Sequence, residues 1–188
     1  MVKNRFILIF LSLLLVSATM MNAMEPKQSI SKAYFAGGCF WGVEYFFEKQ
    51  QGVIDVISGY MGGESQNPTY EEVSYKHTNH VEVVEVQYDA GKVDYETLAR
   101  LFFEMHDPTQ IGGQGPDIGD QYSSVIFYNN ESEKEISEKL IKRLEAKGLT
   151  IATELKTVMP FWRAEEYHQD YYSKKGGTPY CHDYVKRF

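Results

Sequence analysis

Residues 36–47 read AGGCFWGVEYFF and place a cysteine, Cys39, between two glycines and two large aromatic side chains. Residues 31–35, just before this stretch, favour a short strand. From residue 40 to residue 50 the apolar side chains recur at helical spacing, which predicts a helix. The stretch therefore predicts a turn from a strand into a helix, with Cys39 at the amino end of that helix.

A cysteine in this position is suited to act as a nucleophile. Unpaired N–H groups and the dipole at the amino end of a helix favour negative charge, so we expect the pKa of Cys39 to be lowered. The two preceding glycines leave space beside the sulfur for a ligand. Phe40 and Trp41 form an apolar wall next to that sulfur, or they are simply core residues; the pattern leaves both interpretations open.

Working outward, the pattern alternates strands and helices with mostly short connections. We expect loops over residues 59–68 and 107–119, where glycine, proline and asparagine gather. The predicted strands are residues 31–35, 53–57, 81–88, 123–128 and 151–157, and the predicted helices are residues 40–50, 69–75, 94–106, 132–147 and 164–174. This order predicts an α+β fold, with helices packed on a sheet of mixed strand direction.

The first residues are unlike the rest of the chain. Lys3 and Arg5 precede an almost unbroken apolar run over residues 6–16, which is typical of a secretory signal. The run is shorter than the roughly 20 residues that span a bilayer, so no stable membrane insertion is expected after cleavage. We therefore expect residues 1–23 to be a signal peptide, residues 24–188 to form one domain, and the protein to be exported, either periplasmic or secreted.

The charge balance argues against nucleic acid as a partner. The full chain carries 19 basic and 26 acidic residues, a formal net charge of −7. Removing residues 1–23 takes away two basic residues and no acidic one, which gives 17 − 26 = −9. No basic patch compensates this acidic field, so we expect no nucleic acid binding.

The chain has two cysteines, Cys39 and Cys181, and two interpretations of them remain open. An even number of cysteines in an exported protein is typical of a structural disulfide. Cys181, however, lies in the stretch GGTPYCH, whose glycines and proline favour a mobile or irregular segment. Such a segment lets one thiol approach another, as a redox reaction requires.

The predicted strand over residues 81–88 contains a candidate acid. Its alternation puts Glu82 on the same face as Val84, Val86 and Tyr88, and puts Glu85 on the other face. Burial raises the pKa of a carboxyl group, and a carboxyl that stays neutral near pH 7 can donate a proton. The alternative is that Glu82 lies at the exposed end of the strand.

Two tyrosines lie where a loop meets a regular element, a common place for active-site residues. They are Tyr70, after an Asn-Pro-Thr turn, and Tyr122, after a glycine-containing loop. The histidines do not indicate a metal site, because His77 and His80 lie at a loop and no CxxC or HExxH accompanies them. No phosphate-binding loop or redox cofactor motif is visible, so we expect no cofactor.

Several blocks together resemble a known family, the type A peptide methionine sulfoxide reductases. The resemblance covers residues 31–181, and its blocks are GCFWG at 38–42, NPTY at 67–70, HVE at 80–82, HDP at 106–108 and QGPDIGDQY at 114–122. It implies a ferredoxin-like two-layer sandwich. It also implies an enzyme that reduces methionine S-sulfoxide, free or in oxidised proteins and peptides.

The resemblance assigns roles to residues of this chain. It implies that Cys39 attacks the sulfoxide sulfur and that Glu82 protonates the sulfoxide oxygen. Tyr70 and Tyr122 would hold that oxygen, and the remaining substrate contacts would come from Phe40, Trp41 and Asp117, the first two at the methyl group and the last at the substrate backbone.

The resemblance also implies a two-cysteine cycle. The sulfenic acid formed on Cys39 would condense with Cys181, and a thioredoxin-like protein would reopen the disulfide. Two other functions use the same cysteines. One is a thiol peroxidase or another thiol-disulfide oxidoreductase, and the other is a binding module with a permanent disulfide.

Overall fold

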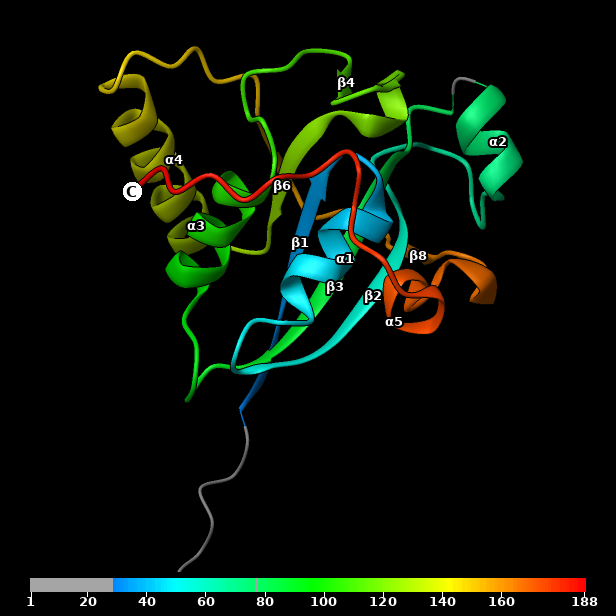
Figure 1. The fold of residues 1–188 in the computed structure, drawn as a ribbon, viewed down its shortest axis with the longest axis horizontal. Coiled ribbons are helices and arrows are strands. Elements are labelled where there is room, and N and C mark those ends of the chain that lie inside the picture. The colour runs from blue at the N-terminus through cyan, green and yellow to red at the C-terminus, as the bar shows by residue number, and fades with distance from the viewer. Residues whose placement is uncertain (1–28, 77) are drawn as a thin grey trace, which may run out of the picture.

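The computed structural model describes residues 29–76 and 78–188, which form a mixed sheet with helices on one face (Figure 1). The strands are β1 (Ile30–Gly37), β2 (Val53–Met61), β3 (Val81–Asp89), β4 (Gly113–Gln114), β5 (Asp117–Ile118), β6 (Ser124–Tyr128), β7 (Glu154–Thr157) and β8 (Trp162–Arg163). The helices are α1 (Phe40–Phe47), α2 (Tyr70–Tyr75), α3 (Tyr95–Met105), α4 (Glu131–Glu145) and α5 (Tyr171–Lys175), with short 3₁₀ turns η1 (Asp120–Tyr122) and η2 (Glu166–His168). The predicted α+β fold is confirmed.

Six strands make the main sheet, in the order β7-β6-β1-β3-β2-β8. All neighbours are antiparallel except β6 and β7, which are parallel and are joined through α4. The sheet therefore has mixed strand directions, as the alternation of elements predicts. β1 and β3 lie side by side at its centre. β1 ends two residues before Cys39, and Glu82 is the second residue of β3.

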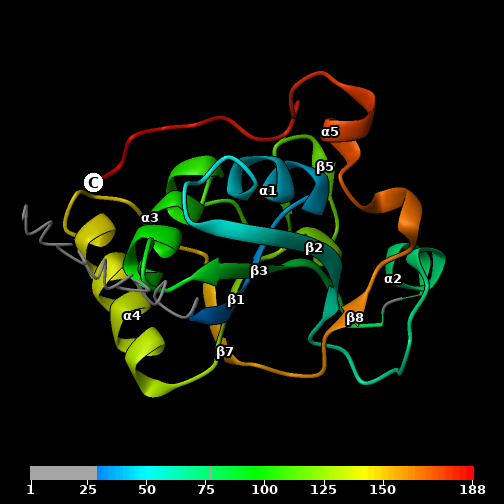
Figure 2. The same cartoon turned by 90° about the horizontal axis from the view of Figure 1, so that it is seen from below.

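The core explains why the helices pack on one face (Figure 2). The ring of Phe35 on β1 lies 5.0 Å from the ring of Phe47 on α1 and 5.2 Å from that of Phe102 on α3, centroid to centroid. On β3, Val84 and Val86 belong to this large cluster, whereas neighbouring residues of opposite parity belong to a smaller cluster on the other face. Each large aromatic side chain buried in this way stabilises the fold by about 1.5–3 kcal/mol.

Local hydrogen bonds fix the starts of the helices predicted from residues 69 and 94. The Thr69 hydroxyl accepts the backbone N–H of Glu72, and the Glu72 carboxylate accepts that of Thr69, a complete capping box. Asp94 accepts the N–H of Thr97 at 2.8 Å and begins α3. These local bonds need only neighbouring residues, which is why the sequence places both helix starts correctly.

Several predicted boundaries are wrong. The helix predicted over residues 40–50 ends at Phe47, and the strand predicted over residues 151–157 begins at Glu154. Residues 59–61 are strand, not loop, because Gly59 lets β8 approach: a Cβ there would lie 2.5 Å from the Trp162 carbonyl oxygen. The predicted loop over residues 107–119 contains the small hairpin β4–β5. The predicted helix over residues 164–174 is broken, because Asp170 has φ of 53° and separates η2 from α5.

The chain after α5 has no regular structure, and we call residues 176–188 the C-terminal segment. In Figure 1 this red segment runs from α5 past the start of α1 toward α3 and α4. The predicted signal peptide, residues 1–23, lies outside the described residues. Within residues 29–76 and 78–188, no helix combines the length and apolarity needed to cross a membrane.

Candidate active site

Cys39 lies at the position predicted for it, immediately before the first turn of α1. Its backbone carbonyl accepts the N–H of Gly42 at 3.0 Å, so it is the residue that caps the helix. Its side chain makes no capping bond and is largely buried. The sulfur is therefore fixed by the junction of β1 and α1, not by a mobile loop.

Glu82 lies beside this helix start and is buried, with 2% of its surface exposed. Its Oε2 accepts the backbone N–H of Phe40, the first residue of α1, at 3.0 Å. Burial raises the pKa of Glu82 well above its usual range, the charge of Cys39 raises it further, and the Phe40 N–H opposes both. Of the two alternatives for Glu82, the buried one is confirmed.

Glu85, on the opposite face of the same strand, shows that burial alone does not decide the protonation state. It is nearly as buried, at 5% exposed, and burial again raises its pKa. Hydrogen bonds to its charged form outweigh this, and its pKa is lowered; the donors are Lys32, Gln87 and Tyr34. Among the described residues no cationic side chain pairs with Glu82, and its raised pKa means that it holds its proton.

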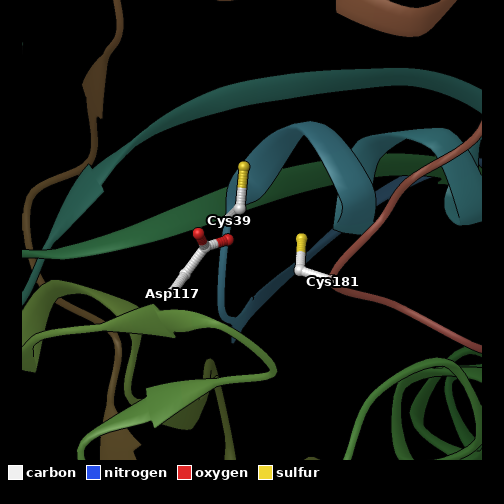
Figure 3. Close-up of side chains that lie close together, drawn as sticks. All are labelled: Cys39, Asp117 and Cys181. Atoms are coloured by element: carbon white, nitrogen blue, oxygen red, sulfur yellow. The ribbon is translucent and has the colours of Figure 1, made fainter.

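Cys181 lies next to Cys39, and both thiols are free (Figure 3). The two sulfurs and a carboxylate oxygen of Asp117 all lie within 4.8 Å of one another. Residues 142 positions apart in the sequence thus meet at one point, because the C-terminal segment crosses the start of α1. This placement agrees with the expectation that the C-terminal segment brings the Cys181 thiol to the Cys39 thiol.

The expected lowering of the Cys39 pKa is wrong for this arrangement. A hydrogen bond to the Cys181 sulfur raises the pKa most, and burial and charge on Cys181 raise it further. The backbone N–H of Trp41 lowers it, as a helix start should, but does not outweigh them. Two sulfurs this close cannot both lose their protons easily, so Cys39 keeps its proton in this arrangement.

Tyr70 and Tyr122 converge on the same acid. Both rings are half-buried, and burial raises the pKa of each phenol. The charge of Glu82 is the next largest cause for both, which requires both phenols to lie near its carboxyl. Both therefore keep their protons and can donate hydrogen bonds to an oxygen placed between them and Glu82.

Phe40 and Trp41 have different environments. Phe40 is a core residue, 1% exposed, with its ring 4.9 Å from that of His168. Trp41 is half-buried; its ring stacks on Tyr171 at 3.7 Å, and its Nε1 donates to His168 Nδ1 at 3.1 Å. Of the two open interpretations, Phe40 is core, while Trp41 forms a fixed apolar surface at the helix start.

Asp117 lies on β5, beside the two sulfurs. Both of its carboxylate oxygens accept the Tyr180 hydroxyl, at 2.9 and 3.2 Å. Because Tyr180 precedes Cys181 in the chain, this bond ties the C-terminal segment to the β4–β5 hairpin close to the thiol pair.

Sequence reasoning missed the residues that support this site. Glu165 accepts the Tyr60 hydroxyl and the Tyr70 backbone N–H, each at 2.9 Å. His168 orients Trp41. Both lie in the stretch predicted as one continuous helix, where the structure instead has the short turn η2 followed by a break at Asp170.

A buried acid, a cysteine at a helix start and a second thiol within reach together define a thiol-dependent oxidoreductase. The chain belongs to the peptide methionine sulfoxide reductase family: the family model described as "Peptide methionine sulfoxide reductase" matches residues 31–188.

Relatives and solved structures agree with this assignment. The peptide methionine sulfoxide reductase MsrA of Nautilia profundicola is 48% identical over 150 residues, 80% of this chain and 87% of that protein. Yeast Mxr1 in its reduced form superimposes with a TM-score of 0.75 at 32% identity, over 84% of this chain and 91% of Mxr1. Methionine sulfoxide reductase A of Corynebacterium diphtheriae has a TM-score of 0.71 at 37% identity, over 80% and 78%.

Proposed function

We propose that this protein reduces methionine S-sulfoxide to methionine, both free and within oxidised proteins and peptides. The observation that carries the proposal is the 3.0 Å bond between the Phe40 N–H and Glu82, which fixes a proton donor at the helix start that holds Cys39. Reduction of a sulfoxide requires a nucleophile for its sulfur and an acid for its oxygen, and both lie at this helix end. Family membership supports the same reaction.

In the first step, the Cys39 sulfur attacks the sulfoxide sulfur. Sulfoxide oxygen is a poor leaving group until it is protonated, and Glu82, which burial keeps neutral, supplies that proton. The S–O bond of the adduct breaks as the protonated oxygen departs as water. A water molecule then attacks the Cys39 sulfur, breaks its bond to the substrate sulfur and releases methionine, which leaves a sulfenic acid on Cys39 and returns one proton. The proton of the Cys39 thiol must leave before this attack, because the thiolate is the nucleophile.

The surrounding side chains position the substrate. Tyr70 and Tyr122 donate hydrogen bonds to the sulfoxide oxygen, and Trp41, fixed by its stack on Tyr171, bounds the methyl group. Asp117, whose carboxylate lies beside the two sulfurs, accepts a backbone N–H of the substrate.

In the second step, Cys181 attacks the Cys39 sulfenic acid, and a disulfide and water form. Thiol exchange with a thioredoxin-like protein then restores both thiols. Yeast Mxr1, one of the solved relatives, has also been solved in complex with Trx2, which supports this class of reductant.

The activity is tested by giving the purified protein a peptide containing methionine S-sulfoxide, with dithiothreitol as reductant. We expect catalytic formation of methionine, and none with Cys39→Ser. Catalytic consumption of hydrogen peroxide without sulfoxide turnover would favour a thiol peroxidase instead. Thiols that stay oxidised under mild reductant, without activity, would favour a structural disulfide.

The location of the protein is a separate proposal. The basic and apolar pattern of residues 1–23 supports export with cleavage after Ala23 or Ala18. Fractionation of the native cells, followed by N-terminal sequencing of the protein from the cytoplasmic, periplasmic and secreted fractions, tests both the location and the cleavage site. A cytoplasmic protein that begins at Met1 would contradict it.

A further inference from the structure

His182 follows Cys181 directly and has no role in the reaction described above. It is buried, at 4% exposed, although it belongs to an irregular segment near the end of the chain. Its ring lies over the first turn of α1, and both ring nitrogens have a defined partner. A buried imidazole beside a reacting sulfur needs a physical explanation.

The partners of the ring fix its tautomer. Nε2 lies 2.8 Å from the carbonyl oxygen of Gly37, and a carbonyl oxygen only accepts, so Nε2 carries the proton. Nδ1 lies 3.1 Å from the Cys181 sulfur. In the neutral ring Nδ1 has a free lone pair, so it accepts the thiol proton of Cys181.

The environment favours the neutral ring. Burial lowers the pKa of His182, and the bond to Gly37 together with the charges of Asp117 and Asp183 opposes this. His106, at the end of α3, also lies close enough to interact with the ring electrostatically. A neutral histidine with a bare nitrogen against a thiol has the properties of a base.

Gly42 shows that the ring has a fixed place. Gly42 is the third residue of α1, where glycine costs about 1 kcal/mol relative to alanine. A Cβ at this position would lie 2.2 Å from His182 Nδ1, with two further ring atoms within 2.9 Å. The helix therefore carries a glycine where the imidazole packs, and a methyl group there would push the ring away.

We propose that His182 is the general base for Cys181 in disulfide formation, an inference that rests on the proposed function. His182 Nδ1 takes the proton from the Cys181 thiol as its sulfur attacks the Cys39 sulfenic sulfur. The S–S bond forms, the S–O bond of the sulfenic acid breaks, and the proton on Nδ1 neutralises the departing hydroxide. Water leaves, and no further oxidant or reductant is needed.

A single-turnover experiment separates this step from the first. Reduced protein is mixed with excess peptide methionine S-sulfoxide without reductant, and both methionine and remaining thiols are followed in time. In His182→Gln we expect one equivalent of methionine at the wild-type rate, and disulfide formation slower by roughly 10²-fold. The sulfenic acid should accumulate and be trapped by dimedone, as in Cys181→Ser.

A second variant keeps the imidazole but displaces it. Gly42→Ala places a methyl group against Nδ1, so we expect the same selective delay, with the native far-UV circular dichroism spectrum retained. The matched control is His80→Gln, because His80 is equally buried but bonds Gly63 and Ser65 and not a sulfur. It should leave the disulfide step unchanged.

Rescue by imidazole and the pH dependence of the disulfide rate distinguish a histidine that acts as a base from one that only fills space. Added imidazole should accelerate disulfide formation in His182→Ala, whose cavity admits it, and the rate in this variant should rise continuously with pH as hydroxide replaces the base. Wild-type disulfide rates in folded His182→Gln and Gly42→Ala, or loss of the methionine burst together with the disulfide step, would overturn the proposal. A wild-type protein that forms no methionine would instead overturn the proposed function.

Discussion

The two cysteines are held by regions of very different construction. Cys39 lies between β1, which is paired on both sides, and the first turn of α1. Cys181 lies in the C-terminal segment, which has no regular structure. The first sulfur must meet an acid at a fixed position, whereas the second must move to form a bond of about 2 Å with the first. The rigid region therefore suits substrate chemistry, and the irregular one suits disulfide exchange.

The C-terminal segment is nevertheless attached beyond Cys181, mainly to Glu104 of α3. The Glu104 carboxylate accepts the Tyr184 hydroxyl at 2.9 Å and the backbone N–H of Arg187 at 3.1 Å. Its backbone carbonyl accepts the N–H of Val185 at 2.7 Å. The predicted irregular segment is confirmed, and it is a strap joined to the domain at both ends.

Removing each sulfur in turn tests this comparison most strongly. Cys39→Ser should form no methionine at all, because the nucleophile is gone. Cys181→Ser should form one equivalent of methionine per protein and then stop when a thioredoxin-like protein is the only reductant. Stopped-time assays of methionine measure both. A full first turnover in Cys39→Ser would show that the rigid region does not carry the nucleophile.

Glu82→Gln tests the acid of the rigid region. We expect sulfoxide reduction to slow by roughly 10²–10⁴-fold, the usual contribution of a general acid. The wild-type rate should fall as pH rises through the raised pKa of Glu82, because the proton is then lost, and the variant should lack this fall. The control is Glu85→Gln on the opposite face of β3, which should keep the wild-type rate and profile.

Glu104→Ala loosens the strap without touching either sulfur. Removing a buried acceptor of several hydrogen bonds costs about 1.5–3 kcal/mol, so disulfide formation should slow by about tenfold or more while the first methionine forms normally. Single-turnover thiol counting measures the difference. Glu145→Ala, an exposed glutamate at the end of α4, is the control. Equal delays of disulfide formation in both variants would contradict the claim that attachment through Glu104 positions Cys181.

Glu44→Gln tests, through stability, the attachment of α1 to β2 and to α5, the helix that precedes the C-terminal segment. Glu44 on α1 accepts the Ser58 hydroxyl and the Tyr171 backbone N–H, and burial raises its pKa to about 7. The folded protein then holds the Glu44 proton more tightly than the unfolded chain does. The contribution of Glu44 to the free energy of unfolding is therefore fully present below about pH 4.5 and is lost as the pH rises toward 7.

The loss is at most about 3 kcal/mol, from 1.36 kcal/mol per pH unit. Urea unfolding at pH 5 and pH 8 measures it, and Glu44→Gln should remove most of the difference between the two. A variant that keeps the full wild-type decline would show that another group titrates.

Local patterns predicted much of the site and missed its support. The period of two along β3 placed Glu82 and Glu85 on opposite faces, and the helical period placed Cys39 at a helix start. Neither pattern could show that α1 covers Glu82. The break at Asp170 was also invisible, because the carboxylate of Glu44, far away in sequence, binds the backbone there and supports a left-handed residue.

The sequence by itself determined the α+β order, the cysteine at a helix start and the two faces of β3, because each depends on neighbouring residues and on the geometry of one element. The tertiary structure decided which acid keeps its proton, that the two thiols meet, and that His182 lies against Cys181. These depend on distances between segments remote in the chain, and burial and charge act through those distances.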